Sequence, residues 1–220
     1  MNEFLLVAVP LFILLGEILL RSGVADRMYG ALAEWLRWLP GGLLHTNIAA
    51  CALFAATSGS SVATAATIGT VGMPAFRDRG YNERLILGSI AAGGTLGILI
   101  PPSLNMIVYG AMTGASVGRL FVAGIIPGII LTLMMSGIII VISLAMRSDR
   151  TPEAMLPLAA RLKLLLHLLP VFGIFFVIMG SIYLGIATPT EAAALGVVGA
   201  LGTAAAMRRL SIAMLHEAFL

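Results

Sequence analysis

The charged residues of this chain fall into short clusters, and the stretches between those clusters are long and apolar. Trp38–Phe76 and Leu85–Gly118 run for 39 and 34 residues without a single Asp, Glu, Lys or Arg. Of the 220 residues, 60% are apolar and only 10% are charged, whereas soluble domains carry about 25% charged residues. A water-soluble fold of this size cannot bury so much apolar surface. The sequence therefore predicts an all-α, polytopic membrane protein.

Composition also excludes several other classes of protein. Cys51 is the only cysteine, so a secreted scaffold held together by internal disulfides is excluded. The apolar content excludes a disordered chain, and a net charge of +3 is too small for a nucleic-acid-binding surface. We therefore expect no nucleic-acid partner, and we interpret the positive residues through their positions along the chain.

The distribution of Lys and Arg predicts which loops share a side of the membrane. If Trp38–Phe76 enters and leaves the membrane on one face, twelve of the thirteen Lys and Arg residues lie in the cytoplasm and only Arg119 lies outside. If the same stretch crosses once, the division falls to nine against four. The positive-inside rule therefore favours entry and exit on the same face.

The length of each arm in that stretch predicts a hairpin rather than two full crossings. Leu43–Thr57 and Val62–Met73 flank a turn at Ser58–Ser61. As helices they would rise about 22 Å and 18 Å, which is too short for a hydrocarbon core of about 30 Å. We therefore predict a re-entrant helical hairpin that ends near mid-membrane. Bare backbone is tolerated there only when it is buried in protein or faces a water-filled cavity.

A second interruption is expected inside Leu85–Gly118. Gly93–Gly97 should loosen a helix that starts at Leu85. Pro101-Pro102-Ser103 should end it, because a proline lacks the N–H and disfavours helical geometry in the residue before it. Leu104–Thr113 would then form a second half-helix. The sequence therefore predicts a discontinuous transmembrane helix whose break lies at a depth similar to that of the hairpin tip.

The rest of the chain is expected to hold regular spans and one interfacial helix. Val24–Leu39 has apolar residues on one face and charges on the other, which is typical of an amphipathic helix in the cytoplasmic interface, here with Trp35 and Trp38 as anchors. The spans are expected at Phe4–Leu20, Phe121–Met146, Leu164–Leu184 and Glu191–Met207.

Two local pairings are also expected near the ends of these spans. Glu17 and Arg21 stand four residues apart, which favours an ion pair along one helix. Thr188-Pro189-Thr190-Glu191 has the spacing of a capping box with proline at the first helical position. We interpret both pairings as structural.

The two interruptions together predict a binding site rich in oxygen atoms. Its candidate residues are Ser58, Ser60, Ser61 and Thr64 from the tip and Gly94, Thr95, Gly97, Pro101 and Ser103 from the broken helix. Hydroxyl and free carbonyl oxygens suit a hard cation such as sodium. Half-helix N-termini, expected at Val62 and Leu104, favour a carboxylate ligand. Because neither interruption holds an ionisable side chain, sodium coupling is favoured over proton coupling.

Other interpretations of the same residues stay open. The serines could cap backbone groups, and stripes of small residues could serve helix packing alone. A serine protease would use Ser60 or Ser61 as its nucleophile, but it needs a base within hydrogen-bond reach. No His is expected on a facing interruption. A channel could be lined by hydroxyls, although a pore does not need a hairpin and a broken helix that meet.

Several segments resemble the large membrane subunit of tripartite ATP-independent periplasmic (TRAP) transporters, and the resemblance covers nearly the whole chain. The strongest are the hairpin tip and the broken helix, Ser58-Gly-Ser-Ser-Val-Ala-Thr-Ala-Ala and Gly94-Thr-Leu-Gly-Ile-Leu-Ile-Pro-Pro-Ser103. Further matches are Pro10-Leu-Phe-Ile-Leu, Leu39-Pro-Gly-Gly42, Gly80-Tyr81 and Gly185-Ile-Ala-Thr-Pro-Thr-Glu-Ala-Ala-Ala194.

The resemblance implies a secondary transporter of the bacterial inner membrane and not an enzyme. Members of the family are built from two inverted repeats and work as elevators. Their partners are a small membrane subunit and a periplasmic solute-binding protein, and their substrate is an organic carboxylate such as a C4-dicarboxylate or sialic acid. No cofactor is expected apart from sodium as the coupling ion. An alternative is another ion-coupled organic anion symporter with a hairpin architecture.

The resemblance also implies a role for each site residue. Sodium ligands are expected at Ser58, Ser61, Gly94, Thr95, Gly97 and Pro101, and substrate contacts at Ser60, Ser61, Thr64, Pro102 and Ser103.

The implied organisation has four parts. Residues 1–39 would form a scaffold helix and an arm helix, and residues 40–118 the hairpin and broken helix of the transport domain. Residues 119–163 would form a transmembrane helix and a cytoplasmic loop, and residues 164–220 the start of the second repeat. Because the family's subunit is longer, we expect this chain to lack the first helix and most of the second repeat, and not to transport alone.

Overall fold

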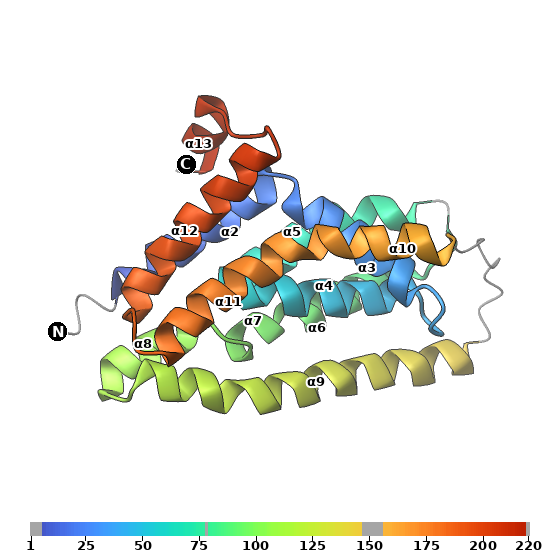
Figure 1. The fold of residues 1–220 in the computed structure, drawn as a ribbon. Coiled ribbons are helices and arrows are strands. Elements are labelled where there is room, and N and C mark those ends of the chain that lie inside the picture. The colour runs from blue at the N-terminus through green and yellow to red at the C-terminus, as the bar shows by residue number, and fades with distance from the viewer. Residues whose placement is uncertain (1–5, 78, 147–155, 219–220) are drawn as a thin grey trace.

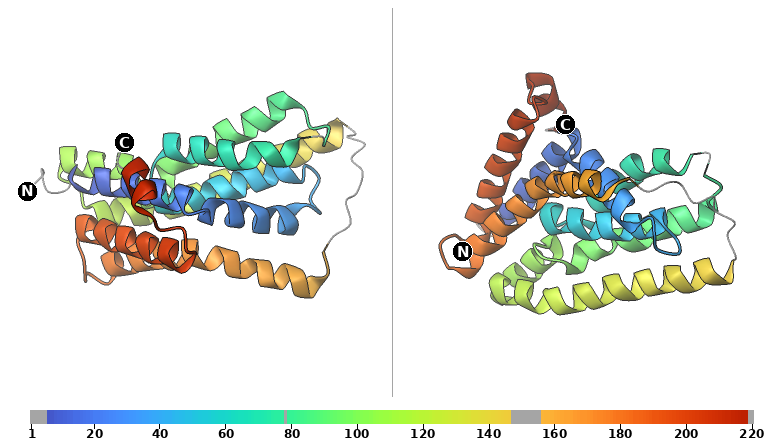
Figure 2. Two further views of the ribbon diagram at one scale, coloured as in Figure 1. Left: turned by 90° about the horizontal axis from the view of Figure 1, so that it is seen from above. Right: turned by 45° about the vertical axis from the view of Figure 1, so that its right-hand side comes forward.

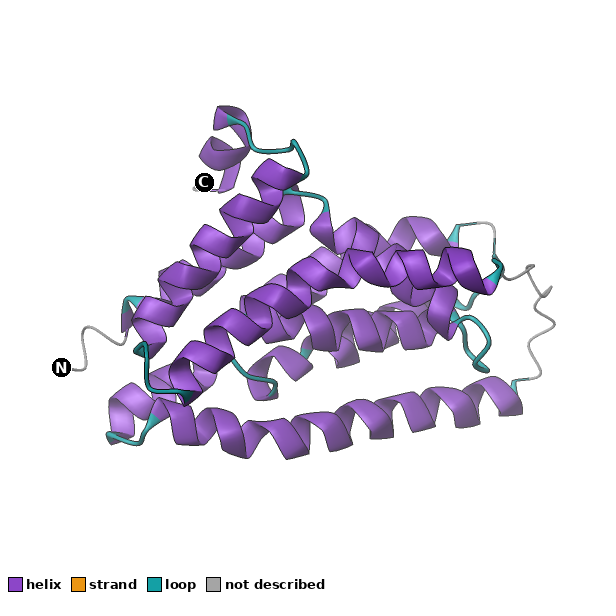
Figure 3. Ribbon diagram, viewed as in Figure 1, coloured by secondary structure: helices purple, strands orange, loops and turns teal. Residues whose placement is uncertain are grey.

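The computed structural model describes residues 6–77, 79–146 and 156–218, and within them every regular element is a helix (Figure 3). In chain order the elements are α2 (Ala8–Arg21), α3 (Val24–Leu36), α4 (Leu43–Ser58), α5 (Ser61–Phe76), α6 (Glu83–Gly94), α7 (Leu96–Leu99), α8 (Leu104–Thr113), α9 (Val117–Ala145), α10 (Leu158–Leu164), the 3-10 helix η1 (Leu165–Leu168), α11 (Leu169–Tyr183), α12 (Pro189–Ala206) and α13 (Ile212–Ala218).

Three helices are long and apolar enough to cross a membrane among the described residues. They are Glu83–Thr113, Val117–Ala145 and Leu158–Tyr183, and a fourth is reached if α2 and α3, bent by 68°, count as one span. The spans expected at Phe121–Met146 and Leu164–Leu184 match the second and third of these helices, which begin earlier, at Val117 and Leu158, and end one residue earlier than expected. The helix expected from Glu191 is α12, which is not one of the three. The expected start at Phe4 lies outside the described residues.

The helices form two groups that pack on each other. In one group, α2 lies beside α12, which packs in turn on α11. In the other, α4, α5, α6 and α7 lie between α9 and the α10–α11 stretch (Figures 1 and 2). α2 and α11 contact α4, and α2 also contacts α5 and α8, so the two groups meet along α2, α11 and the first arm of the hairpin.

The structure has a helical hairpin and a broken helix near the predicted residues, but the second arm of the hairpin is longer than predicted, because it spans Ser61–Phe76 and not Val62–Met73. α4 and α5 have 16 residues each, join at Gly59 and return to the same end of the molecule (Figure 1). The broken helix stops after Leu99 and restarts at Leu104, and its Pro101–Pro102 peptide bond is cis. The glycine run causes only a one-residue interruption at Thr95, where the backbone keeps helical dihedral angles. The prolines therefore make the decisive break.

The amphipathic segment is shorter than expected and packs against protein. α3 ends at Leu36 rather than Leu39, and Val24 and Met28 of its apolar stripe are buried. Trp35 donates from its indole N–H to the carbonyl oxygen of Arg161, 3.1 Å away, whereas Trp38 is 63% exposed. One of the two expected anchors is therefore tied to the α10 helix.

Candidate functional site

The hairpin tip is a two-residue turn formed by Gly59 and Ser60. Gly59 ends α4 in the left-handed region, with φ of 63°, a conformation that glycine adopts without steric cost. Ser60 is extended and its hydroxyl accepts a hydrogen bond from the backbone N–H of Ala63 at 3.3 Å, which caps α5. The alternative interpretation, that the tip serines cap backbone groups, is therefore confirmed for Ser60.

The break in the second helix docks directly on this tip. The backbone N–H of Leu104, the first residue of α8, donates to the carbonyl oxygen of Gly59 at 2.9 Å. A Cβ at position 59 would lie 2.7 Å from the carbonyl oxygen of Pro102. The two interruptions are therefore in contact, and the N-terminus of α8 lies next to the N-terminus of α5.

Two glycines of the broken helix let the hairpin approach at backbone distance. A Cβ at Gly97 would lie 2.7 Å from the backbone nitrogen of Ser61 and 2.9 Å from the carbonyl oxygen of Ser60. A Cβ at Gly94 would lie 2.7 Å from the Cβ of Ala65. These distances are shorter than packed side chains allow, so Gly94 and Gly97 form the surface on which the start of α5 rests.

The predicted hydroxyls divide into two sets. Ser58 and Thr64 are fully buried and share a hydrogen bond of 3.1 Å between their side-chain oxygens. Ser103 is also fully buried, and it donates to the carbonyl oxygen of Ile98 at 2.6 Å. Ser60 and Ser61 are only partly buried, at the tip itself.

The residues predicted for sodium are only partly brought together. Ser61, Gly94 and Gly97 are in direct contact. Thr95 is exposed, and its hydroxyl donates to the carbonyl oxygen of Ala92 at 2.7 Å. Pro101 is buried in the break. The tip carbonyls are not bare either, because those of Gly59 and Ser60 accept from Leu104 and Thr64. A carbonyl oxygen has a second lone pair, so these atoms keep acceptor capacity.

The long helix α9 supports the break from behind, which the sequence analysis missed. A Cβ at Gly124 would lie 2.5 Å from the carbonyl oxygen of Leu99, and one at Gly128 would lie 3.0 Å from the side chain of Ile100. The signal was present as glycines four residues apart, a spacing that lets two helices approach closely.

A buried polar chain at the base of the hairpin was also missed. The hydroxyl of Tyr29 donates to Asn47 Oδ1 at 2.7 Å, and Asn47 Nδ2 donates to the hydroxyl of Ser89 at 2.8 Å. These residues come from α3, α4 and α6. Nearby, His45 Nε2 donates to the carbonyl oxygen of Pro40 at 2.9 Å, and its Nδ1 lies 3.3 Å from the hydroxyl of Ser136. The only sequence signal for these hydrogen bonds is Asn47, an isolated amide inside an apolar helix.

The pairings predicted near the span ends are confirmed. Arg21 Nε lies 3.2 Å from a carboxylate oxygen of Glu17. The Thr188 hydroxyl accepts from the backbone N–H of Glu191, and the Glu191 carboxylate accepts from the backbone N–H of Thr188 at 2.8 Å. Within the described part of the chain, no group of three or more His, Cys, Asp and Glu residues could hold a metal ion.

Comparison with known proteins gives a consistent picture. The family model described as "Tripartite ATP-independent periplasmic transporter, DctM component" matches residues 1–220. The C4-dicarboxylate TRAP transporter large permease protein DctM of Pseudomonas aeruginosa is 40% identical over 90% of this chain and 46% of its own length. The ectoine/5-hydroxyectoine large permease protein UehC of Ruegeria pomeroyi is 36% identical over 89% of this chain and 45% of its own length.

A third relative is longer. The sialic acid TRAP transporter permease protein SiaT of Haemophilus influenzae is 35% identical over 88% of this chain, and the match covers 31% of its length. The chain thus spans about half the length of the first curated relatives it matches, and less of this one.

Proposed function

The chain belongs to the DctM component family of tripartite ATP-independent periplasmic transporters, and from this premise we propose that it forms part of the large membrane subunit of a sodium-coupled importer. Its substrate would be an organic carboxylate, such as a C4-dicarboxylate or sialic acid. The partners would be a small membrane subunit and a periplasmic solute-binding protein, in the bacterial inner membrane. The activity is that of a carrier and not of an enzyme.

The docking of the hairpin tip on the broken helix is the observation that carries this proposal. Gly59 and Gly97 bring two interrupted helices to backbone distance from each other. Irregular backbone inside a membrane protein is tolerated where it is buried in protein or lines a cavity. In transporters, interrupted helices of this kind typically form the substrate and ion sites.

We propose that sodium binds where the start of α5 rests on α7. The ligands would be hydroxyl and carbonyl oxygens of Ser58, Ser61, Gly94, Thr95, Gly97 and Pro101. The oxygen-rich, uncharged composition supports this, because sodium is a hard cation that needs no carboxylate or His to release a proton. Gly124 and Gly128 of α9 contact the break in the second helix. They lie about 10 to 16 Å along α9 from its first residue, and this depth supports a site within the bilayer.

We propose that the substrate carboxylate binds near the paired N-termini of α5 and α8. Contacts would come from Ser60, Ser61, Thr64, Pro102 and Ser103. Helix N-termini present N–H groups and a positive dipole end, which favour an anion. The relatives named for C4-dicarboxylate and sialic acid transport support a carboxylate as the substrate class. Because the chain spans about half of such relatives, the other half of the site would come from elsewhere in the subunit.

The two groups of helices support an elevator mechanism as part of the proposal. The hairpin, the broken helix and α9 would move together, and α2, α11 and α12 would stay with the scaffold. A protease is not supported, because the only His of the hairpin, His45, lies at the opposite end from Ser60. The His45 ring lies at hydrogen-bond distance from Pro40 and Ser136.

Uptake into liposomes tests the proposal. The full-length subunit and its two partners would be reconstituted, and uptake of a labelled C4-dicarboxylate or sialic acid would be compared under imposed sodium and proton gradients. We expect uptake that requires the sodium gradient. Uptake driven by a proton gradient without sodium would overturn the coupling, and unchanged sodium dependence after Ser61→Ala and Thr95→Ala would remove the site assignment.

A further inference from the structure

The helix α2 contacts both arms of the hairpin, and its Gly16 lies against the hairpin tip. A Cβ at Gly16 would lie 3.1 Å from the Cβ of Ser58 and 3.7 Å from its Cα. Both residues are buried. α2 packs mainly on α12, outside the hairpin. The contact of Gly16 with Ser58 therefore joins the two groups of helices at the hairpin tip.

The contact falls on the buried hydroxyl pair of the tip. Ser58 is the last residue of α4, and its hydroxyl shares the 3.1 Å hydrogen bond with Thr64 on α5. This bond spans the turn from the inside. A shift of Ser58 would therefore move both arms of the tip, and with them Ser61 on the face of Gly97.

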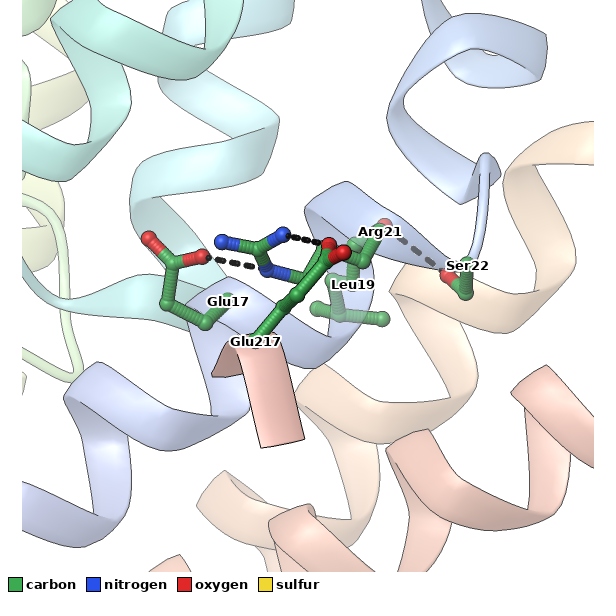
Figure 4. A network of polar contacts seen from close by, with 5 residues as sticks. All are labelled: Glu17, Leu19, Arg21, Ser22 and Glu217. Atoms are coloured by element: carbon green, nitrogen blue, oxygen red, sulfur yellow. Dashed lines mark hydrogen bonds and ion pairs between the residues drawn. The ribbon is translucent and has the colours of Figure 1, made fainter. Parts of the chain in front are cut away.

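α2 cannot withdraw from the tip easily, because its other side is also packed. A Cβ at Gly196 of α12 would lie 3.1 Å from Leu15, the neighbour of Gly16. One turn further on, Arg21 is paired with Glu17 at 3.2 Å and with Glu217 of α13 at 2.6 Å (Figure 4). Extra volume at position 16 would therefore be taken up by the tip.

We propose that Gly16 is a positioning residue, through which α2 sets the position of the hairpin tip and hence the affinity of the sodium site. This inference rests on the proposed function, because it assigns Gly16 a role toward that same site. Gly16 does not touch the ion. It acts through Ser58, so a larger residue displaces the tip while the sodium ligands themselves stay intact.

The test replaces Gly16 by Ala and by Val in the full-length subunit with its partners. Alanine favours the helix by about 1 kcal/mol over glycine, so a loss in Gly16→Ala is assigned to the contact and not to the helix. Gly88→Ala is the matched control, because Gly88 lies in a helix with no atom within 4 Å of an added Cβ. Half-saturating sodium and the maximal uptake rate are measured for each variant.

We expect half-saturating sodium to rise about tenfold in Gly16→Val and by a smaller factor in Gly16→Ala, since residues that orient ion ligands typically contribute 10- to 100-fold to affinity. Gly88→Ala should not change it. A lower maximal rate with unchanged half-saturating sodium in both Gly16 variants would overturn the proposal, because the contact would then not act on the sodium site.

A second measurement does not depend on transport. In a background in which Cys51 and every other cysteine of the complex are replaced by Ala, Ser61→Cys is labelled with a thiol reagent in the presence and absence of Gly16→Val. We expect the labelling rate to change several-fold with Gly16→Val and not with Gly88→Ala, and an unchanged rate overturns the inference. If the unsubstituted complex shows no sodium-driven uptake, the proposed function fails, and the labelling rate still decides whether Gly16 positions the tip.

Discussion

The two ends of the hairpin are held in opposite ways. At the tip, Gly59 and Gly97 remove side chains so that backbone meets backbone. At the base, Tyr29, Asn47 and Ser89 join three helices through side-chain hydrogen bonds. Polar side chains that satisfy one another rigidify a buried region. At the tip, the carbonyl oxygens of Gly59 and Ser60 each accept one hydrogen bond from a backbone N–H and keep a second lone pair. The base is therefore held by side-chain hydrogen bonds and the tip by close backbone packing, and the ligand site proposed at the tip predicts that the two ends respond differently to substitution.

The largest effect is expected from a side chain added at the tip. Gly97→Ala places a Cβ within 3 Å of backbone atoms of Ser60 and Ser61, which cannot rotate away as a side chain can. We expect sodium-driven uptake to fall about 100-fold, as for a displacement of about 1 Å at a reacting site. Uptake by the reconstituted complex checks this. Gly88→Ala is the control, and near-normal uptake in Gly97→Ala would mean that tip and break are not in contact in the working protein.

The base should respond in stability rather than in ligand affinity. Asn47→Leu leaves the Tyr29 hydroxyl without its acceptor and removes the donor to Ser89. We expect a loss of about 2 kcal/mol in the free energy of unfolding, the typical cost of an unsatisfied buried polar group. Thermal unfolding in detergent measures it, beside half-saturating sodium. If sodium affinity fell and stability did not, the contrast between base and tip would be wrong.

A gentler change at the base should give a smaller effect of the same kind. Tyr29→Phe removes only one donor, so Asn47 keeps its bond to Ser89. We expect a loss of about 1 kcal/mol, as for one hydrogen bond. Tyr109→Phe provides the control, because Tyr109 is 57% exposed. Equal melting temperatures for the two variants would show that the Tyr29 bond does not hold the base.

The same contrast explains what the sequence could predict. Both interruptions were predicted at the right residues, because glycine at position 59 and prolines at 101 and 102 act on the backbone next to them. α4 begins at Leu43 as expected, and α5 begins at Ser61, one residue before the predicted Val62. The end of α5 at Phe76 was predicted three residues too early, at Met73. Local chemistry of this kind needs no knowledge of the neighbours.

Contacts between distant segments could not be predicted in the same way. Gly94 and Gly97 were interpreted as loosening a helix, yet they serve as a contact surface for the hairpin. Asn47 gives no hint that its partners are Tyr29 and Ser89, because those residues come from other helices. In the sequence, a glycine that bends its own helix cannot be told from a glycine that lets a second helix pack closely. Only the packing in the structure distinguishes the two roles.

The smallest effect is expected from Ser103→Ala, in the break that contacts the hairpin tip. The Ser103 hydroxyl donates to the carbonyl oxygen of Ile98 at 2.6 Å inside the break, and removing one hydrogen bond typically costs about 1 kcal/mol or less. If Ser103 also contacts substrate, half-saturating substrate should rise together with this small loss of stability. Thr113→Ala is the control, because its exposed hydroxyl makes a similar bond to Tyr109 at 2.8 Å. A fall in stability with unchanged substrate affinity would assign Ser103 to the fold of the break and leave recognition to Ser60 and Ser61.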